Sequence, residues 1–256
     1  MTAALLRVVP GDAALVFNQG GESTLLISDL HLGLEKEMAK KGFSLPAYSI
    51  RMVERVKGIA DSYDIKRLMV LGDVKHSVGK VEDIDWGVVP WFFDTMLDLF
   101  ESVGVVPGNH DGGIKTVLPP RVALFPSHGT VIGEGRGRIG VAHGHAWPSE
   151  EAIASRNLVI GHSHFTYELK DALGARSREP VWVSSTYDIA ELMEAAGYES
   201  RAKGEGKLTV MPPFNRLVGG QPINRSRSFE FGPVLSSRSV SLEGADIFLM
   251  DGTRVT

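Results

Sequence analysis

The chain has 256 residues, a hydrophobic fraction of 43%, a charged fraction of 23% and a formal net charge of -4 at pH 7. This composition indicates a globular protein and excludes extensive disorder, and the length suffices for one large α/β domain or two small ones. Because the chain contains no cysteine, disulfides and thiolate metal sites are excluded, and any metal has to bind nitrogen and oxygen ligands. Acidic and basic residues are mixed along the chain, so no overall field attracts polyanions.

The N-terminal stretch MTAALLRVVPGDAALVF is mildly apolar but interrupted by Arg7, Pro10, Gly11 and Asp12. Such an interruption fits neither the apolar region of a secretory signal nor a membrane span. We therefore expect a cytoplasmic protein that does not interact with a membrane.

The first half of the chain alternates buried strands with helices. Apolar runs within 24–33, 66–73 and 103–111 each end in polar residues, as buried strands do when they lead into a functional loop. Helical spacing of apolar residues predicts helices over 46–63, which opens on a helix-compatible proline, and over 86–103. Two successive strand–helix–strand units predict a parallel sheet with right-handed crossovers.

The second half is richer in short strands and turns. One short helix is expected over 149–157. Strands are predicted at 121–125, 129–133, 138–145, 158–164, 180–185, 206–215, 228–232 and 244–250. An α/β half followed by a mostly β half fits one domain with two packed sheets.

Histidines mark the ends of the predicted strands. The chain has eight histidines, and six of them lie in the four short segments DLHLG (29–33), GNHD (108–111), AHGH (142–145) and GHSH (161–164), each directly after an apolar run. Since the carboxyl ends of strands in α/β sheets form a ligand-binding crevice, these segments can converge although they are distant in sequence. Glycines at 72, 108, 144 and 161 allow close approach of the backbone.

Each segment alone also has a structural explanation. An Asp-x-His sequence is commonly a turn with a hydrogen-bonded histidine, Gly-Asp after a strand is frequent, and GNHD can form an Asx turn. The occurrence of five such pieces in one order, each at a strand end, favours a metal site.

The order Asp-x-His, Gly-Asp, Gly-Asn-His-Asp, His-Gly-His and Gly-His-x-His over residues 29–164 resembles the calcineurin-like metallophosphoesterase superfamily. Within it, LLISDLHLGLE, VLGDVKH, VMPPFN and GGQPIN are similar to prokaryotic, chiefly archaeal, phosphoesterases related to the nuclease subunit SbcD. The resemblance implies a four-layer α/β-β/α sandwich. It also implies a single domain over 1–256, in which residues from about 180 to 256 complete the second sheet.

The resemblance further implies two adjacent divalent metal ions. Asp29, His31 and His164 would hold the first ion, Asn109, His143 and His162 the second, and the carboxylate of Asp73 would bridge both. His110 matches the catalytic histidine of the superfamily, and Asp111 would orient it. Imidazole ligands favour manganese, iron or zinc over magnesium and calcium, and we expect manganese.

Other residues leave alternatives open. His76 and His145 can line the pocket or form structural bonds, and Arg-x-Arg pairs at 136/138, 176/178 and 225/227 can clamp phosphates or remain solvated. The aromatic group DWGVVPWFF is interpreted as core packing in preference to exposed base stacking. The resemblance also suggests that Asn215 lies near the substrate.

The expected function is metal-dependent hydrolysis of phosphodiester bonds, with DNA or RNA as the substrate because the narrower resemblance is to repair nucleases. The acidic net charge and the lack of room for a DNA-gripping domain count against a nucleic-acid substrate. A small-molecule or nucleotide phosphodiesterase or phosphatase is the alternative, and an inactive metal-binding scaffold is the alternative from another class. Protein partners and oligomeric state are not predicted.

Overall fold

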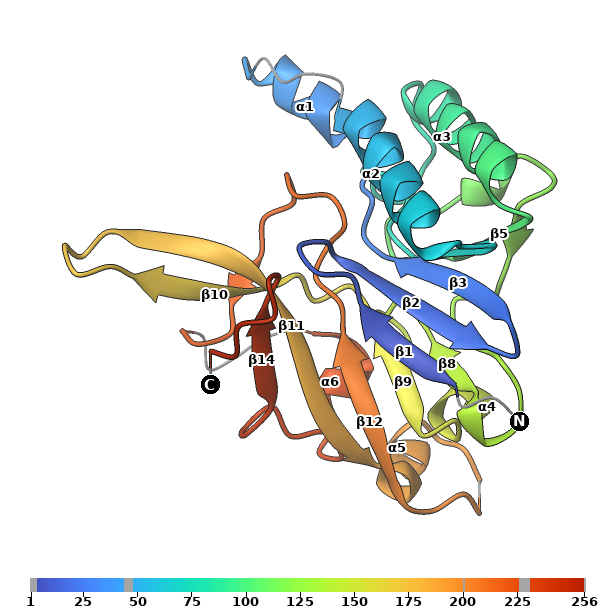
Figure 1. The fold of residues 1–256 in the computed structure, drawn as a ribbon, viewed down its shortest axis with the longest axis vertical. Helices are drawn as coiled ribbons and strands as arrows, with labels where there is room; N and C mark the ends of the chain where they lie inside the picture. The colour runs from blue at the N-terminus through green and yellow to red at the C-terminus, as the bar shows by residue number, and fades with distance from the viewer. Residues whose placement is uncertain (1–3, 44–47, 200, 226–230, 256) are drawn as a thin grey trace.

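The computed structural model describes residues 4–43, 48–199, 201–225 and 231–255. Two β-sheets pack against each other, and helices cover the outer side of each sheet (Figure 1). The α/β four-layer sandwich expected from the sequence is therefore present. Among the described helices, none combines the length and apolar character needed to cross a bilayer.

The first sheet begins with an antiparallel meander and continues as a parallel sheet. Its strands, in spatial order, are β1 (Leu5–Val8), β2 (Ala14–Gln19), β3 (Glu22–Ile27), β4 (Arg67–Leu71), β5 (Ser102–Val106) and β6 (Ala123–Leu124). Strands β3 to β6 are mutually parallel. The helices α2 (Tyr48–Tyr63) and α3 (Asp85–Leu99) cover its outer face, and α1 (Leu34–Lys40) follows β3 (Figure 1).

The second sheet is mixed. Its spatial order is β13 (Gln221–Pro222), β10 (Phe165–Lys170), β11 (Arg176–Asp188), β12 (Glu205–Val210), β9 (Asn157–Ile160), β8 (Ile139–Val141) and β7 (Thr130–Ile132), with β14 (Asp246–Leu249) paired to β11. The short helices α4 (Glu150–Ile153), α5 (Ile189–Ala195) and α6 (Gly232–Ser236) pack on its outer face. Two 3-10 turns, η1 (Ile114–Thr116) and η2 (Gly135–Gly137), lie in loops.

Alternation along the strands produces the layers. In β3, Leu25 and Ile27 point to the helices of the first sheet, whereas Leu26 points to the second sheet. Strand β9 repeats the pattern, with Val159 between the sheets and Leu158 facing the helices on the other side. Because side chains alternate along a strand, a continuous apolar run supplies two cores at once. These strands are buried on both faces for that reason.

Several elements differ from expectation. The helix expected over 46–63 is α2, although residues 44–47 lie outside the described residues. The helix expected over 86–103 ends at Leu99, because Phe100 is already extended and β5 follows. The strands β1, β2, β10 and β13 and the helices α1 and α5 were not predicted. The helix expected over 149–157 is limited to α4, because β9 begins at Asn157. Part of the strand expected at 228–232 lies outside the described residues, and its last residue begins α6.

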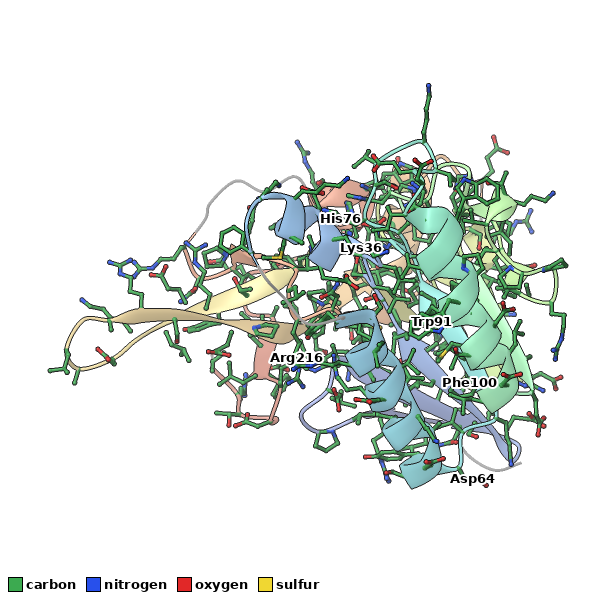
Figure 2. All side chains as sticks on the ribbon, turned by 90° about the horizontal axis from the view of Figure 1, so that it is seen from above. Lys36, Asp64, His76, Trp91, Phe100 and Arg216 are labelled. Atoms are coloured by element: carbon green, nitrogen blue, oxygen red, sulfur yellow. The ribbon has the colours of Figure 1, made fainter. Side chains whose placement is uncertain are left out.

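The aromatic group on α3 is only partly core. Phe92 and Phe93 are fully buried, as expected. Trp86 and Trp91 instead leave 57% and 41% of their surface exposed, and Figure 2 shows Trp91 on this outer helix. The prediction of core packing was wrong for the two tryptophans because α3 is an outer-layer helix with a solvent-facing side. The assignment of residues 1–256 to one domain stays a prediction.

Candidate metal centre

Five strand ends bring the predicted ligands to one edge of the sandwich. Strands β3, β4 and β5 of the first sheet and β8 and β9 of the second all lead into the loops that carry them. These loops contribute Asp29, His31, Asp73, Asn109, His143, His162 and His164. Parallel strands place their carboxyl ends together, and the packing of the two sheets brings the two sets of ends face to face. The sequence clusters therefore converge as predicted.

The loops hold an uncommon backbone conformation at the predicted ligands. Positive φ angles occur at Asp29 (57°), His31 (41°), Asp73 (49°), His162 (70°) and His164 (43°). Elsewhere in the described chain, only Asp64 and Arg156 among non-glycine residues share this conformation. Left-handed backbone is costly for residues with a Cβ and gathers at functional sites, where the surrounding structure imposes it. Strain at five predicted ligands supports a functional role for this edge.

The donor atoms form two groups that share one carboxylate. One group contains Asp29, His31, Asp73 and His164, and the other contains Asp73, His143 and His162; within each group the donor atoms lie within 4.8 Å of one another. Asp73 belongs to both and is 2% exposed. This division matches the two ligand sets expected from the sequence, with Asp73 between them. The ligand roles themselves stay predictions.

The first group contains an unsatisfied nitrogen that fits a metal ligand. Nε2 of His31 is buried, makes no hydrogen bond to any described residue, and lies 3.6 Å from Oδ2 of Asp73. Burial lowers the pKa of His31 to about 3, so its imidazole is neutral and offers a lone pair. Oδ1 of Asp29 lies 2.9 Å from Nε2 of His164. A cation between these oxygen and nitrogen atoms would satisfy them.

The second group is centred on His143, which is fully buried. Its Nδ1 donates a hydrogen bond to the carbonyl oxygen of Leu71 at 2.8 Å, which directs Nε2 to the site. That Nε2 lies 3.4 Å from Oδ1 of Asp73 and 3.2 Å from Oδ1 of Asn109. Burial lowers the pKa of the His143 imidazole, but the hydrogen bond and charge of Asp73 outweigh this and raise it to about 9. Burial lowers the pKa of His162 to about 4.

Two glycines make this convergence possible. A Cβ at Gly108 would lie 2.2 Å from Oδ1 of Asp73 and 2.9 Å from Nε2 of His143. At Gly72, which has a φ of +78°, a Cβ would lie 2.3 Å from Nδ1 of His143. Any larger residue at either position would occupy the space of the candidate ligands. The residues present therefore fit cation binding at the donor groups in both donor chemistry and shape.

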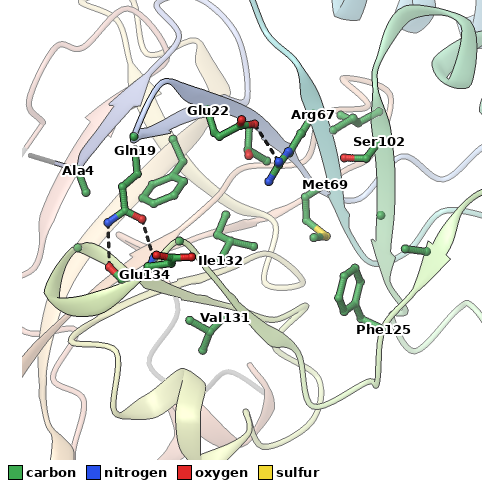
Figure 3. A pocket seen from close by; sticks show the side chains of 18 of the residues that line it. Ala4, Gln19, Glu22, Arg67, Met69, Ser102, Phe125, Val131, Ile132 and Glu134 are labelled. Atoms are coloured by element: carbon green, nitrogen blue, oxygen red, sulfur yellow. Dashed lines mark hydrogen bonds and ion pairs between the residues drawn. The ribbon is translucent and has the colours of Figure 1, made fainter. Parts of the chain in front are cut away.

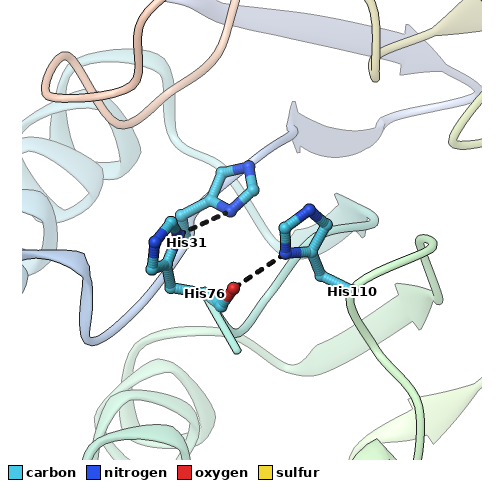
Figure 4. A group of neighbouring side chains, drawn as sticks. All are labelled: His31, His76 and His110. Atoms are coloured by element: carbon cyan, nitrogen blue, oxygen red, sulfur yellow. Dashed lines mark hydrogen bonds between the residues drawn. The ribbon is translucent and has the colours of Figure 1, made fainter. Parts of the chain in front are cut away.

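His110 lies beside the shared carboxylate. Its backbone N–H donates to Oδ1 of Asp73 at 3.0 Å, and its Nε2 is 3.8 Å from Oδ2 of Asp73. The ring Nδ1 donates to the carbonyl oxygen of His76 at 2.8 Å, since a carbonyl can only accept (Figure 4). This bond leaves Nε2 as the atom available to a bound molecule.

The carboxylate of Asp111 bonds to backbone N–H groups of two loops. One of its oxygens accepts a hydrogen bond from the N–H of Gly108 at 2.7 Å, and the other accepts from the N–H groups of Val74 at 2.9 Å and Lys75 at 3.3 Å. Its carboxylate thus ties the loop after β5 to the loop after β4, and the carbonyl of His76 accepts from the ring of His110. Among the described residues Asp111 has no hydrogen bond to the ring of His110, and its contacts join the loops that carry Asp73 and Asn109; its role in orienting His110 stays a prediction.

His76 connects His31 to helix α1. Nδ1 of His76 lies 3.4 Å from Nδ1 of His31, and Nε2 of His76 lies 2.9 Å from a carboxylate oxygen of Glu37 (Figure 4). Donation from Nδ1 of His31 to Nδ1 of His76, and from Nε2 of His76 to Glu37, satisfies these three ring nitrogens. Nε2 of His31 is then left for a cation. Figure 2 shows His76 close to Lys36, which lies on α1 with Glu37. The sequence left this role of His76 open.

Contacts within the structure define the positions of two further residues, His145 and Asn215. The ring of His145 lies 5.2 Å from that of His143, so it borders the second donor group. Asn215 is fully buried and donates from Nδ2 to the carbonyl of Leu30 at 2.8 Å, while its Oδ1 accepts from the N–H of Leu217 at 2.9 Å. Its side chain thus braces the loop that carries Asp29 and His31, and the suggested position of Asn215 near the substrate stays a prediction. No sequence pattern indicated this brace.

A large cavity lies elsewhere in the described chain. It measures about 1050 Å³ and is lined by Phe17, Arg67, Met69, Phe125 and other residues at the opposite ends of the first-sheet strands (Figure 3). An ion pair between Glu22 and Arg67 at 2.8 Å stands at its edge. It shares no lining residue with the donor groups, so size alone does not locate the candidate site.

No family model matches the chain. No curated protein matches it either. Among solved structures, nuclease MPE from Pseudomonas putida covers 97% of this chain and 97% of its own, with 15% identity and a TM-score of 0.51. The phosphoesterase YfcE from Escherichia coli covers 91% of this chain and 96% of its own, with 14% identity and a TM-score of 0.40.

The likeness to the nuclease extends over nearly the whole of both chains. At 15% identity it concerns the fold. The donor groups around Asp73 are, by contrast, a property of this chain. The chain therefore has the α/β sandwich fold of the metallophosphoesterase type, in which two sheets are flanked by helices, as the nuclease from Pseudomonas putida does.

Proposed function

We propose that this protein belongs to the calcineurin-like metallophosphoesterases and hydrolyses phosphodiester bonds with two divalent metal ions, preferably manganese. The observation that carries the proposal is the shared carboxylate: two groups of donors meet at Asp73, and each offers nitrogen and oxygen atoms suited to a transition metal. Asp29, His31 and His164 would hold one ion, and Asn109, His143 and His162 the other. When bound, the ions would activate water and neutralise charge on the phosphate.

The protein's own groups would supply binding and proton transfer. Nδ1 of His110 is held by the His76 carbonyl, so Nε2 is directed beside Asp73. As an imidazolium, His110 would donate a hydrogen bond from Nε2 to a phosphate oxygen and then protonate the leaving oxygen. Asp111 would fix the position of His110 relative to Asp73, because it joins the loops that carry them.

The substrate proposed is a nucleic-acid strand. The fold is that of a nuclease, and the narrower sequence resemblance is to phosphoesterases related to a nuclease subunit. A nucleotide or another small diester is the competing substrate, and the net charge of -4 favours it.

The test uses metal-stripped protein to which manganese is restored. Hydrolysis of end-labelled single-stranded DNA is measured beside hydrolysis of a bis-nitrophenyl phosphodiester, with the His110→Asn variant as a control for chemistry at this site. Cleavage of both substrates by the wild-type protein and of neither by the variant supports the proposal. Cleavage of the small diester alone would redirect the search to a metabolite, and manganese binding without any hydrolysis would support the inactive scaffold.

A further inference from the structure

A basic surface lies on the hairpin formed by β10 and β11. Strand β10 begins at Phe165, directly after the candidate ligand His164, so the hairpin leads away from the metal centre. In both orientations the hairpin extends beyond the rest of the chain (Figures 1 and 2). Its position makes it accessible to a molecule larger than one phosphate ester.

The strand register gathers the cations on one face. Lys170 pairs with Arg176, and Glu168 pairs with Arg178, in the antiparallel ladder. Directly paired residues, and residues two apart on one strand, lie on the same face of a sheet. Lys170, Arg176 and Arg178 therefore share a face with Glu168. Glu179, one position along from Arg178, lies on the other face.

A nearly buried carboxylate organises the arginines. Oε1 of Glu168 accepts from Nη1 of Arg176 at 2.7 Å and from Nε of Arg225 at 2.9 Å, and Nε of Arg178 lies 3.8 Å from Oε2. The Glu168 side chain is only 7% exposed, whereas those of the three arginines are 47% to 58% exposed. Lys170 lies on the same face, so four cations and one carboxylate leave an excess of three positive charges there.

The arrangement is held from a second part of the chain. The side chain of Asn224 bonds to the backbone of Glu168. Its Oδ1 accepts from the N–H of Glu168 at 3.0 Å, and its Nδ2 donates to the carbonyl of Glu168 at 2.9 Å. Arg225 is the next residue, so its guanidinium reaches Glu168 from a fixed position. A guanidinium has five N–H donors, and these contacts leave others directed to solvent. Arg227, the remaining member of this Arg-x-Arg pair, lies outside the described residues.

The distance from the metal centre defines the ligand. With a rise of about 3.3 Å per residue, Glu168 lies about 13 Å and Lys170 about 20 Å along the strand from His164. Successive phosphates of one strand advance by about 3.4 Å along the axis of a duplex and by more in an extended single strand, so this face would reach phosphates up to about four to six nucleotides from a bond at the metal centre. A small diester is too short to reach it.

We propose that Lys170, Arg176, Arg178 and Arg225 form a binding site for the phosphate backbone of a nucleic-acid strand, several nucleotides from the bond at the metal centre. The proposal rests on the proposed function, whose substrate class it specifies. Guanidinium groups bind phosphate oxygens through paired N–H donors, and backbone contacts of this kind need no base sequence. The site therefore predicts strand binding that depends on length and salt but not on sequence.

The test is binding of fluorescein-labelled single-stranded DNA to metal-free protein, followed by fluorescence anisotropy. Strands of about 20 and about 2 nucleotides are compared over a range of salt concentrations. The double variant Lys170→Gln/Arg178→Gln removes two charges and keeps the 2.7 and 2.9 Å contacts to Glu168, so the hairpin retains its main ion pairs. The matched control, Arg136→Gln/Arg138→Gln, removes two charges at another Arg-x-Arg pair, and Arg136 lines the distant cavity.

The Lys170→Gln/Arg178→Gln variant should weaken binding of the long strand by about fivefold or more. The slope of log K against log salt concentration should become shallower by about 1.4. Binding of the short strand should change by less than about twofold. The control should leave both strands within about twofold of wild type. Equal effects of the two variants, or equal effects on the two strand lengths, would overturn the proposal. Failure of the proposed function is detected separately, as absence of diester hydrolysis by the manganese-loaded wild-type protein.

Discussion

Nε2 of His143 lies 3.4 Å from Oδ1 of Asp73, and both side chains are withdrawn from solvent. Burial favours the neutral forms of both groups, but their hydrogen bond and opposite charges raise the pKa of His143 to about 9 and hold the pKa of Asp73 well below its usual range. In the metal-free protein this pair is therefore an ion pair at neutral pH. A metal ion would have to take the place of the proton.

Manganese binding should therefore strengthen as the pH rises. Below about pH 9 the metal-free protein keeps a proton on His143, and only a neutral imidazole can be a ligand. His31 and His162, whose pKa values burial lowers to about 3 and about 4, are already neutral and add no proton release. We expect the affinity of the site that contains His143 to rise up to about tenfold per unit between about pH 6 and about pH 8. Calorimetric titrations in two buffers of different ionisation enthalpy count the protons released, and a count of zero would contradict this.

The Asp73→Asn variant should lose both ions and all detectable hydrolysis, because an amide offers one neutral oxygen in place of a carboxylate shared by two cations. Metal content by mass spectrometry and turnover of a small diester measure this. Asp64→Asn is the matched control, since Asp64 has the same positive φ of 49° but an 89% exposed side chain. Normal turnover by Asp73→Asn would exclude the bridging role.

The His110→Asn variant should retain its metal and lose rate. The ring lies outside the two donor groups that share Asp73, although it forms a third group with His31 and His76. Removing a positioned general acid costs about 10²- to 10⁴-fold in rate. His128→Asn is the control, because the exposed His128 also bonds through Nδ1 to a backbone carbonyl, that of Trp147 at 2.9 Å. Loss of metal from His110→Asn would instead assign His110 to the ligand shell.

The Asp111→Asn variant should be less stable and bind metal more weakly. The amide replaces one acceptor oxygen by a donor that faces the N–H groups of Gly108 or of Val74 and Lys75, at a cost of about 1 to 3 kcal/mol. Urea unfolding of the metal-free protein measures this. Metal affinity should fall about 10- to 100-fold, as for other groups that support ligands.

A matched control and a pH profile complete that experiment. Asp171 accepts two backbone N–H bonds in an exposed turn. Asp171→Asn should therefore lower the free energy of unfolding by about 0.5 kcal/mol or less, as surface substitutions usually do. If Asp111 acted on the ring of His110 instead of on the loops, Asp111→Asn would shift the pH–rate profile of the loaded enzyme without changing the free energy of unfolding.

Much of the fold was predictable because the core strands consist of continuous apolar residues. Strands buried on both faces have continuous hydrophobic stretches, which identified β3, β4, β5 and β9. The short β1, which is largely exposed, and the short helices α5 and α6 have weaker signals, since only one side of each meets a core. Their places depend on which surface the sheets leave uncovered.

The sequence by itself determined which side chains reach the candidate site, because donors that follow apolar runs must lie at strand ends. Only the tertiary structure decided how they are used. It placed Asp111 against backbone N–H groups, withdrew Asn215 behind the loop of Asp29, and joined Arg225 to Glu168. Such contacts link residues up to 185 positions apart. They depend on how two sheets face each other and on left-handed turns that no local pattern specifies.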